Sequence, residues 1–110
     1  MKESEFQRTV IELARTCHWK VAHFRPVKQL RADGTTRYLT PVQADGVGFP
    51  DLILLRGSRG IAWELKSDRG VAKPEQVEWL KAFGAAGFEV GVVFPMNWDY
   101  VERTLTSPAD

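Results

Sequence analysis

The chain has 110 residues, 44% of them hydrophobic, and a net charge of +1, which suits a single domain over residues 1–110. Its single cysteine, Cys17, excludes an intramolecular disulfide, and with only two histidines a structural zinc site is not expected. No apolar run has the length of a membrane span or the position of a signal peptide. We therefore expect a cytoplasmic protein with no membrane partner.

The first predicted element is a helix over residues 3–17. Apolar residues recur there at helical spacing, and Cys17 falls on the same stripe, which favours an inert thiol in the core. Residues 19–25 are predicted to form a strand. Residues 26–50 are rich in polar residues, proline and glycine, which predicts a long loop, with a short hairpin around residues 32–34 as an alternative.

Basic residues are concentrated around the start of this loop. Between residues 20 and 37 the only acid is Asp33, whereas from residue 74 onward six acids accompany two bases. The asymmetry fits a surface that binds nucleic-acid phosphates, and it equally fits a solvated loop that happens to be basic. The five basic residues of the first region are Lys20, Arg25, Lys28, Arg31 and Arg37.

The second half of the chain predicts a hairpin followed by alternating elements. Residues 51–56 and 61–66 are two strands joined by a glycine-bounded turn, which is typical of an antiparallel hairpin. Pro74 suits the start of a helix that Gly87 closes. Residues 88–94 are predicted to be an interior strand, and Asn97 to cap a last helix that ends at residue 105 and packs on the sheet. The order is α-β-β-β-α-β-α, an α/β fold.

Chemistry-bearing side chains gather on the predicted hairpin. Asp51 opens its first strand, and Glu64 and Lys66 lie two residues apart in the second, so they share one face. Two carboxylates, with the Leu65 carbonyl between Glu64 and Lys66, are the oxygen ligands that Mg²⁺ or Mn²⁺ takes in phosphodiester hydrolysis. Lys66 would then activate water or stabilise charge on the phosphate. The alternative is an exposed Glu–Lys pair of little energetic value.

These residues resemble a known set of motifs. Together with an acid in the first helix they are similar to the PD-(D/E)xK nuclease superfamily and, more narrowly, to the VRR-NUC family, whose small stand-alone members are common in phages and bacteria. The resemblance extends from Glu5 to about residue 105. The matching segments are Gly48-Phe49-Pro50-Asp51-Leu52, Glu64-Leu65-Lys66 and Gln76.

The resemblance carries expectations for fold and site. It implies a restriction-endonuclease-like α-β-β-β-α-β core with a mixed sheet, to which this chain adds a C-terminal helix. It also implies that Asp51 and Glu64 bind metal, that Lys66 is catalytic, that Glu5 is the helix acid near the metal, and that Gln76 orders the site. Glu3 is the alternative for the helix position.

We therefore expect a Mg²⁺- or Mn²⁺-dependent DNA endonuclease in the cytoplasm of a bacterium or of a phage-infected cell. The small family members resemble Holliday-junction resolvases, and a two-fold homodimer would place two symmetric cuts in branched DNA. A non-catalytic nucleic-acid-binding module with the same fold is the alternative. A sequence-specific restriction-type nuclease is a weaker one, because only the loop over residues 26–50 is free to read bases.

Overall fold

The computed structural model describes residues 2–24, 27–39 and 42–108. Among these residues, no helix combines the length and the apolar character needed to cross a bilayer. In chain order the elements are α1 (Glu3–Thr16), β1 (Lys20–His23), β2 (Val27–Leu30), β3 (Thr36–Leu39), β4 (Leu52–Arg56), β5 (Arg59–Leu65), α2 (Pro74–Ala85), β6 (Glu89–Val93), the 3₁₀ helix η1 (Pro95–Asn97) and α3 (Trp98–Thr106).

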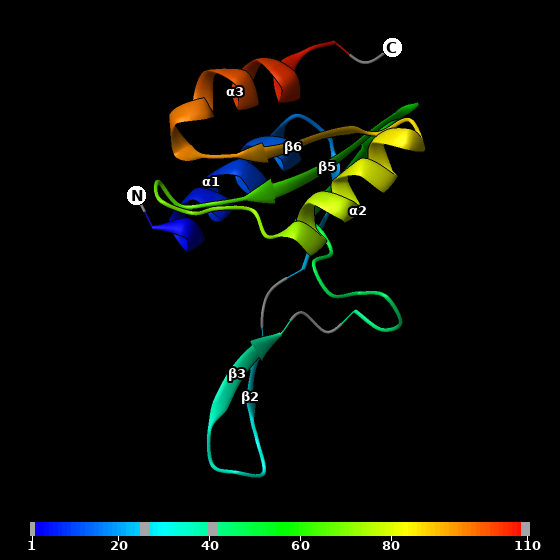
Figure 1. Ribbon diagram of the computed structural model, residues 1–110. Coiled ribbons are helices and arrows are strands. Elements are labelled where there is room, and N and C mark those ends of the chain that lie inside the picture. The colour runs from blue at the N-terminus through cyan, green and yellow to red at the C-terminus, as the bar shows by residue number, and fades with distance from the viewer. Residues whose placement is uncertain (1, 25–26, 40–41, 109–110) are drawn as a thin grey trace.

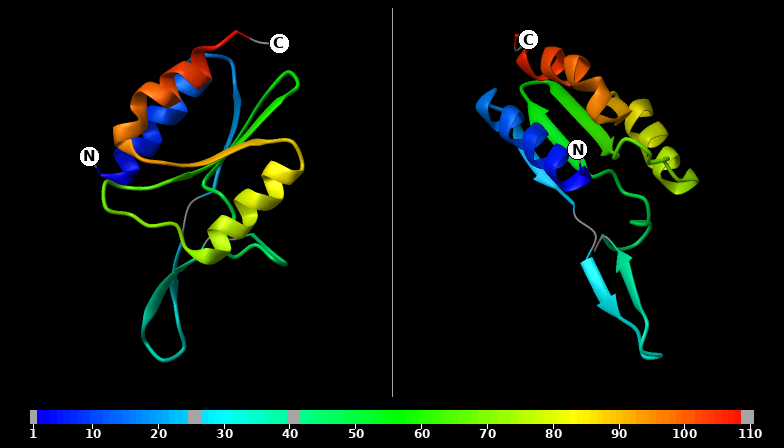
Figure 2. Two further views of the ribbon diagram at one scale, coloured as in Figure 1. Left: turned by 45° about the horizontal axis from the view of Figure 1, so that its top comes forward. Right: turned by 90° about the vertical axis from the view of Figure 1, so that its left-hand side faces the viewer.

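The main sheet is mixed and has the strand order β1-β4-β5-β6. β4 and β5 form the expected antiparallel hairpin, and α2 provides the crossover to β6, which runs parallel to β5. The central strand β5 is buried on both faces from Ile61 to Leu65. Figure 2 shows α1 and α3 lying together on one side of the strands and α2 on the other. The α/β fold and its mixed sheet are therefore confirmed.

The core lies between the sheet and the α1–α3 pair. Phe6, Val10 and Ala14 of α1 are buried, as their helical spacing predicts, and Cys17 packs at the edge of the same cluster. Trp63 of β5 faces α3, where its ring lies 5.9 Å from that of Tyr100. The odd-numbered residues of β5 thus build the core, which leaves the even-numbered ones for the face that α2 covers.

Between β1 and β4 the chain forms a separate two-stranded hairpin, β2–β3, which we call the arm (residues 27–39). It projects from the sheet in Figure 1 and gives the molecule its extents of 51 × 31 × 21 Å. Its turn is well defined: Gly34, with φ +88°, donates to the Arg31 carbonyl, and Asp33 accepts bonds from the Thr35 amide and hydroxyl. The predicted alternative of a short hairpin within the loop is confirmed.

Three local predictions are wrong or shifted. β6 is an edge strand rather than an interior one, and Val90 is 36% exposed on it. Asn97 accepts a bond from the Phe94 amide at the start of η1 and makes no side-chain cap on α3. Lys66 follows β5 rather than belonging to it, and its amide donates to the Val93 carbonyl. Apolar content alone did not distinguish a central strand from an edge strand.

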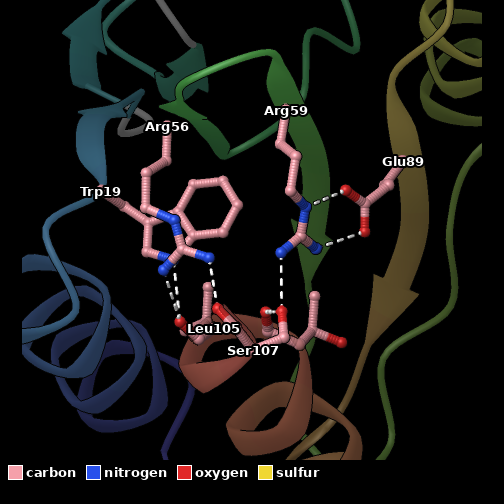
Figure 3. A network of polar contacts seen from close by, with 7 residues as sticks. Trp19, Arg56, Arg59, Glu89, Leu105 and Ser107 are labelled. Atoms are coloured by element: carbon pink, nitrogen blue, oxygen red, sulfur yellow. Dashed lines mark hydrogen bonds and ion pairs between the residues drawn. The ribbon is translucent and has the colours of Figure 1, made fainter. Parts of the chain in front are cut away.

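Two arginines tie the helix ends to the β4–β5 turn (Figure 3). The Arg56 guanidinium donates to the carbonyls of Leu105 and Ser107 at the C-terminal end of α3. It also donates to the Cys17 carbonyl at the C-terminal end of α1. The buried Trp19 ring lies 4.4 Å from the Arg56 Cζ atom and donates from its Nε1 to the Leu105 carbonyl. A single cation thus satisfies carbonyls that the two helices leave without intrahelical partners.

The second arginine joins this network to β6. Arg59 makes two bonds with the Glu89 carboxylate at 2.8 and 2.9 Å, and it donates to the Ser107 hydroxyl. Its Cζ atom lies 5.0 Å from the Trp19 ring centroid. Cation–aromatic contacts and bidentate ion pairs of this kind fix side-chain geometry as well as adding stability.

We expect Arg56→Met to lower the free energy of unfolding by about 2–4 kcal/mol, because it strands several partly buried carbonyls. Urea denaturation followed by tryptophan fluorescence measures the change. Arg69→Met removes an exposed arginine after β5 and is the matched control, expected within about 0.5 kcal/mol of wild type. Equal midpoints for the two variants would show that the Arg56 network contributes nothing.

Candidate active site

Asp51 and Glu64 lie opposite each other on neighbouring segments. In the β4–β5 register Leu52 pairs with Trp63, so the next antiparallel position places Asp51 across from Glu64. Residues that are directly opposite in such a ladder point to the same face. Both carboxylates therefore reach the face that α2 covers, and both are buried, with Asp51 9% and Glu64 2% exposed. The alternative of a solvent-exposed Glu–Lys pair is excluded for Glu64.

Each carboxylate is held by specific donors. The Leu65 amide donates to Asp51 Oδ2 at 2.8 Å. Gln76 Nε2 donates to Glu64 Oε1 at 2.9 Å, and Lys66 Nζ lies 3.5 Å from the same oxygen. The second oxygen of Glu64, Oε2, is buried and has no hydrogen-bond partner among the described residues. A buried carboxylate oxygen without a donor is expensive unless something else occupies that direction.

The side-chain amide of Gln76 makes two hydrogen bonds, one through its oxygen and one through its nitrogen. Its Oε1 accepts the Lys73 amide at 2.7 Å, which closes the first turn of α2, while its Nε2 holds Glu64. Pro74 starts this helix as predicted. The sequence-based expectation that Gln76 orders the site therefore corresponds to a direct contact with one of the two acids.

The loop before β4 sets the position of Asp51. Gly48 has φ +83°, and a Cβ atom there would lie 2.7 Å from the Glu75 backbone, so only glycine lets this loop approach α2 so closely. Trp79 of α2 donates to the Asp45 and Val47 carbonyls. The Phe49 ring packs edge-on against the Trp79 ring at 5.0 Å. This packing holds the Gly-Phe-Pro segment against α2 and leads Asp51 into the site.

A cavity of about 340 Å³ opens over the two acids. Lys66 lines it, and so does Glu3 at the start of α1, whereas the exposed Glu5 lies outside it. The helix acid expected near the site is thus Glu3, which was the alternative. The other polar and aromatic residues around the cavity are Phe49, Lys73, Glu75, Gln76 and Tyr38 of the arm.

Sequence reasoning missed Tyr38, Lys73 and Glu75 among these lining residues, and it gave Glu3 only as the alternative to Glu5. Tyr38 is distant from the motif in sequence, and no local pattern indicates that the side chains of Lys73 and Glu75, close to Gln76, border the cavity. Glu3 had a usable signal, because it precedes Phe6 by three residues and so lies nearer the buried stripe of the helix than Glu5 does.

Burial perturbs both acids, and the charge of Asp51 adds to the shift of Glu64. Desolvation, followed by the charge of Asp51, raises the pKa of Glu64 from 4.5 to about 8. Desolvation also raises the pKa of Asp51, against the lowering effect of the Leu65 amide. Without a further cation Glu64 therefore retains its proton near neutral pH, and a bound cation would displace it.

The donor set fits a hard divalent cation. Both carboxylates line one cavity, and Glu64 Oε2 has no donor among the described residues; Mg²⁺ takes one or two protein carboxylates, with water and phosphate completing its shell. The Leu65 amide points toward Asp51, and in a strand the carbonyl of the same residue points to the same side. Within the described residues, no three carboxylate, imidazole or thiol side chains gather at metal-binding distance, so the protein's side-chain ligands would be few.

The basic residues predicted to bind nucleic acid do not all lie on one element. Lys28, Arg31 and Arg37 are exposed on the arm, and Lys20 is exposed on β1. Arg25 lies outside the described residues. Arg37 donates from Nε to Gln29 Oε1 on the opposite strand. The arm therefore presents three cations beside one anion, Asp33, whereas acids outnumber lysines in the lining of the cavity.

Comparison of the chain with protein-family models, with curated proteins and with solved structures finds no match.

We expect the thermal midpoint of the metal-free protein to fall as pH rises from 4.5 toward 8, the two pKa values of Glu64. The folded state binds the Glu64 proton more tightly than the unfolded chain, so this contribution to stability is complete below pH 4.5 and is lost as the pH passes through about 8. Thermal melts in EDTA measure the effect. Glu64→Gln cannot ionise and should flatten the decline; parallel declines in the two proteins would contradict this assignment.

Proposed function

We propose that this chain is a metal-dependent DNA endonuclease of the type that the VRR-NUC family represents. The observation that carries the proposal is the pair of buried carboxylates, Asp51 and Glu64, directed to one cavity with the Lys66 ammonium beside them. The element order supports it: without the arm, the elements run α-β-β-β-α-β and end with a helix.

The proposed reaction is the addition of water to a DNA phosphodiester with cleavage of one P–O bond. Asp51, Glu64 and the Leu65 carbonyl would hold Mg²⁺ or Mn²⁺, which when bound polarises the phosphate and makes water a better nucleophile. Lys66 carries a charge next to Glu64 and would stabilise negative charge that develops on the phosphate. Gln76 is a positioning residue that fixes Glu64.

The preferred substrate within this proposal is branched DNA such as a four-way junction. Two symmetric cuts need two copies of the site related by a two-fold axis, so we propose a homodimer. A cleavage panel of labelled junction, flap, nicked, duplex and single-stranded DNA, run with each metal, tests the substrate. Sedimentation velocity tests the dimer, and a monomer that resolves junctions at the same rate at every concentration would rule it out.

Asp51→Asn and Glu64→Gln should each reduce the rate of cleavage by about 10³-fold or more while the fold is retained, because each removes an anionic ligand for the cation. Gln76→Ala should reduce it by a smaller factor, about 10- to 100-fold, as expected for a residue that orients a ligand. Single-turnover plasmid nicking with Mg²⁺ or Mn²⁺ provides the rates.

Glu5→Gln is the matched control, since this helix acid is exposed and lies outside the cavity. It should cleave like wild type, whereas Glu3→Gln should be impaired. If the wild-type chain binds DNA but neither cation supports any cleavage, the protein is a non-catalytic nucleic-acid-binding module instead.

Neutralising Lys28, Arg31 and Arg37 together should weaken DNA binding and make it less dependent on salt. Every side-chain cation that neutralises a phosphate adds about 0.7–0.9 to the slope of log K against log salt, so removing three of them should reduce the slope by about 2–3. Fluorescence anisotropy over a salt series measures the slope. An unchanged slope in the triple glutamine variant would show that the arm does not bind phosphates.

A further inference from the structure

One face of the arm carries an aromatic side chain, a cation and an exposed apolar side chain together. Lys28 pairs with Tyr38 across the ladder, and Leu30 pairs with Thr36. Opposed residues and residues two apart in a strand share a face, so these four side chains form one surface. Two of them are large and well exposed, with Leu30 73% and Tyr38 69% accessible.

Tyr38 is the member of this face that reaches the site. It lines the cavity over Asp51 and Glu64, whereas Leu30 lies farther along the arm toward the turn and does not line it. An aromatic ring that is mostly exposed and also borders a catalytic cavity is available to a ligand held there. Its cross-strand neighbour Lys28 places an ammonium group on the same surface.

We propose that Tyr38 is a stacking platform for an unpaired nucleobase next to the phosphate held at Asp51 and Glu64, with Lys28 contacting the adjoining backbone. This inference rests on the proposed function. Surfaces that hold single-stranded nucleic acid combine exposed aromatic rings with cations along the backbone, and the arm provides both within one two-stranded ladder.

Charge favours a nucleic acid over a protein as the occupant. The arm carries Lys28, Arg31 and Arg37 against Asp33 alone, and each of the three cations is exposed. A polyanion is attracted to such a surface, whereas a second copy of the arm would bring three further positive charges against it. The acids of the cavity would meet the same polyanion only through a bound cation.

The proposal specifies a substrate class. A base inside a continuous duplex is already stacked on its neighbours, so removing it for Tyr38 requires unstacking. A gap or a flap provides a base that is already free. The platform would therefore select DNA in which an unpaired nucleotide adjoins the cut, such as a gap or a flap, without reading sequence.

The test compares Tyr38→Leu with Tyr38→Phe, which keeps the ring. Affinity is measured by fluorescence anisotropy with Ca²⁺ in place of Mg²⁺, on a nicked duplex and on the same duplex with one unpaired nucleotide at the nick. Tyr38→Leu should weaken binding to the unpaired substrate by about 5- to 150-fold and binding to the nicked duplex by about twofold or less. Tyr38→Phe and Leu30→Ala should stay within about twofold of wild type on both.

A 5-iodo-deoxyuridine at the unpaired position provides a second readout. On irradiation it should cross-link to residue 38 in wild type and in Tyr38→Phe, and this cross-link should disappear in Tyr38→Leu. Unchanged affinity of Tyr38→Leu for the unpaired substrate, or a cross-link elsewhere, would overturn the platform. A Tyr38→Leu variant that sediments as a different oligomer but binds DNA like wild type would also overturn it, because a second copy of the chain would then occupy the arm.

The two proposals fail separately. Cleavage that depends on Asp51 but is indifferent to Tyr38 would remove the platform and leave the nuclease. Stacking that depends on Tyr38, with no cleavage in Mg²⁺ or Mn²⁺, would support the platform and remove the nuclease.

Discussion

The structure depends on keeping two carboxylates, Asp51 and Glu64, side by side in a buried position. Desolvation and like charge both oppose this arrangement. The surrounding structure offsets it with the Leu65 amide, the Gln76 amide group and the Lys66 ammonium. These donors satisfy three directions and leave Glu64 Oε2 without one. A site built in this way is complete only when a cation or a proton joins the two acids.

Most of the fold around these acids could be predicted from local patterns. The helical spacing of Phe6, Val10 and Ala14 and the glycine turn after Arg56 each specify an element with little competition. The same hairpin register brings Asp51 opposite Glu64, so the centre of the site was accessible from sequence. β6 was misjudged because Val90 and its neighbours read as fully buried, and only the strand order shows that one edge of this strand is open.

The rim of the site could not be predicted in the same way. Tyr38 reaches the cavity because the arm leaves the sheet between β1 and β4, and Lys73 because α2 crosses over β5. Both positions are products of long-range packing. The choice between Glu3 and Glu5 depends on the rotation of α1, which Phe6 fixes by entering the core. Two residues along a helix is more than half a turn, so one acid faces the cavity and the other faces water.

Gln76 also links two events that are usually separate. The residue that closes the first turn of α2 is the one that steadies Glu64. Helix ends open more readily than helix centres. Each opening of the first turn of α2 would therefore also break the bond between Gln76 and Glu64. A cation that binds both acids would in turn stabilise this end of the helix.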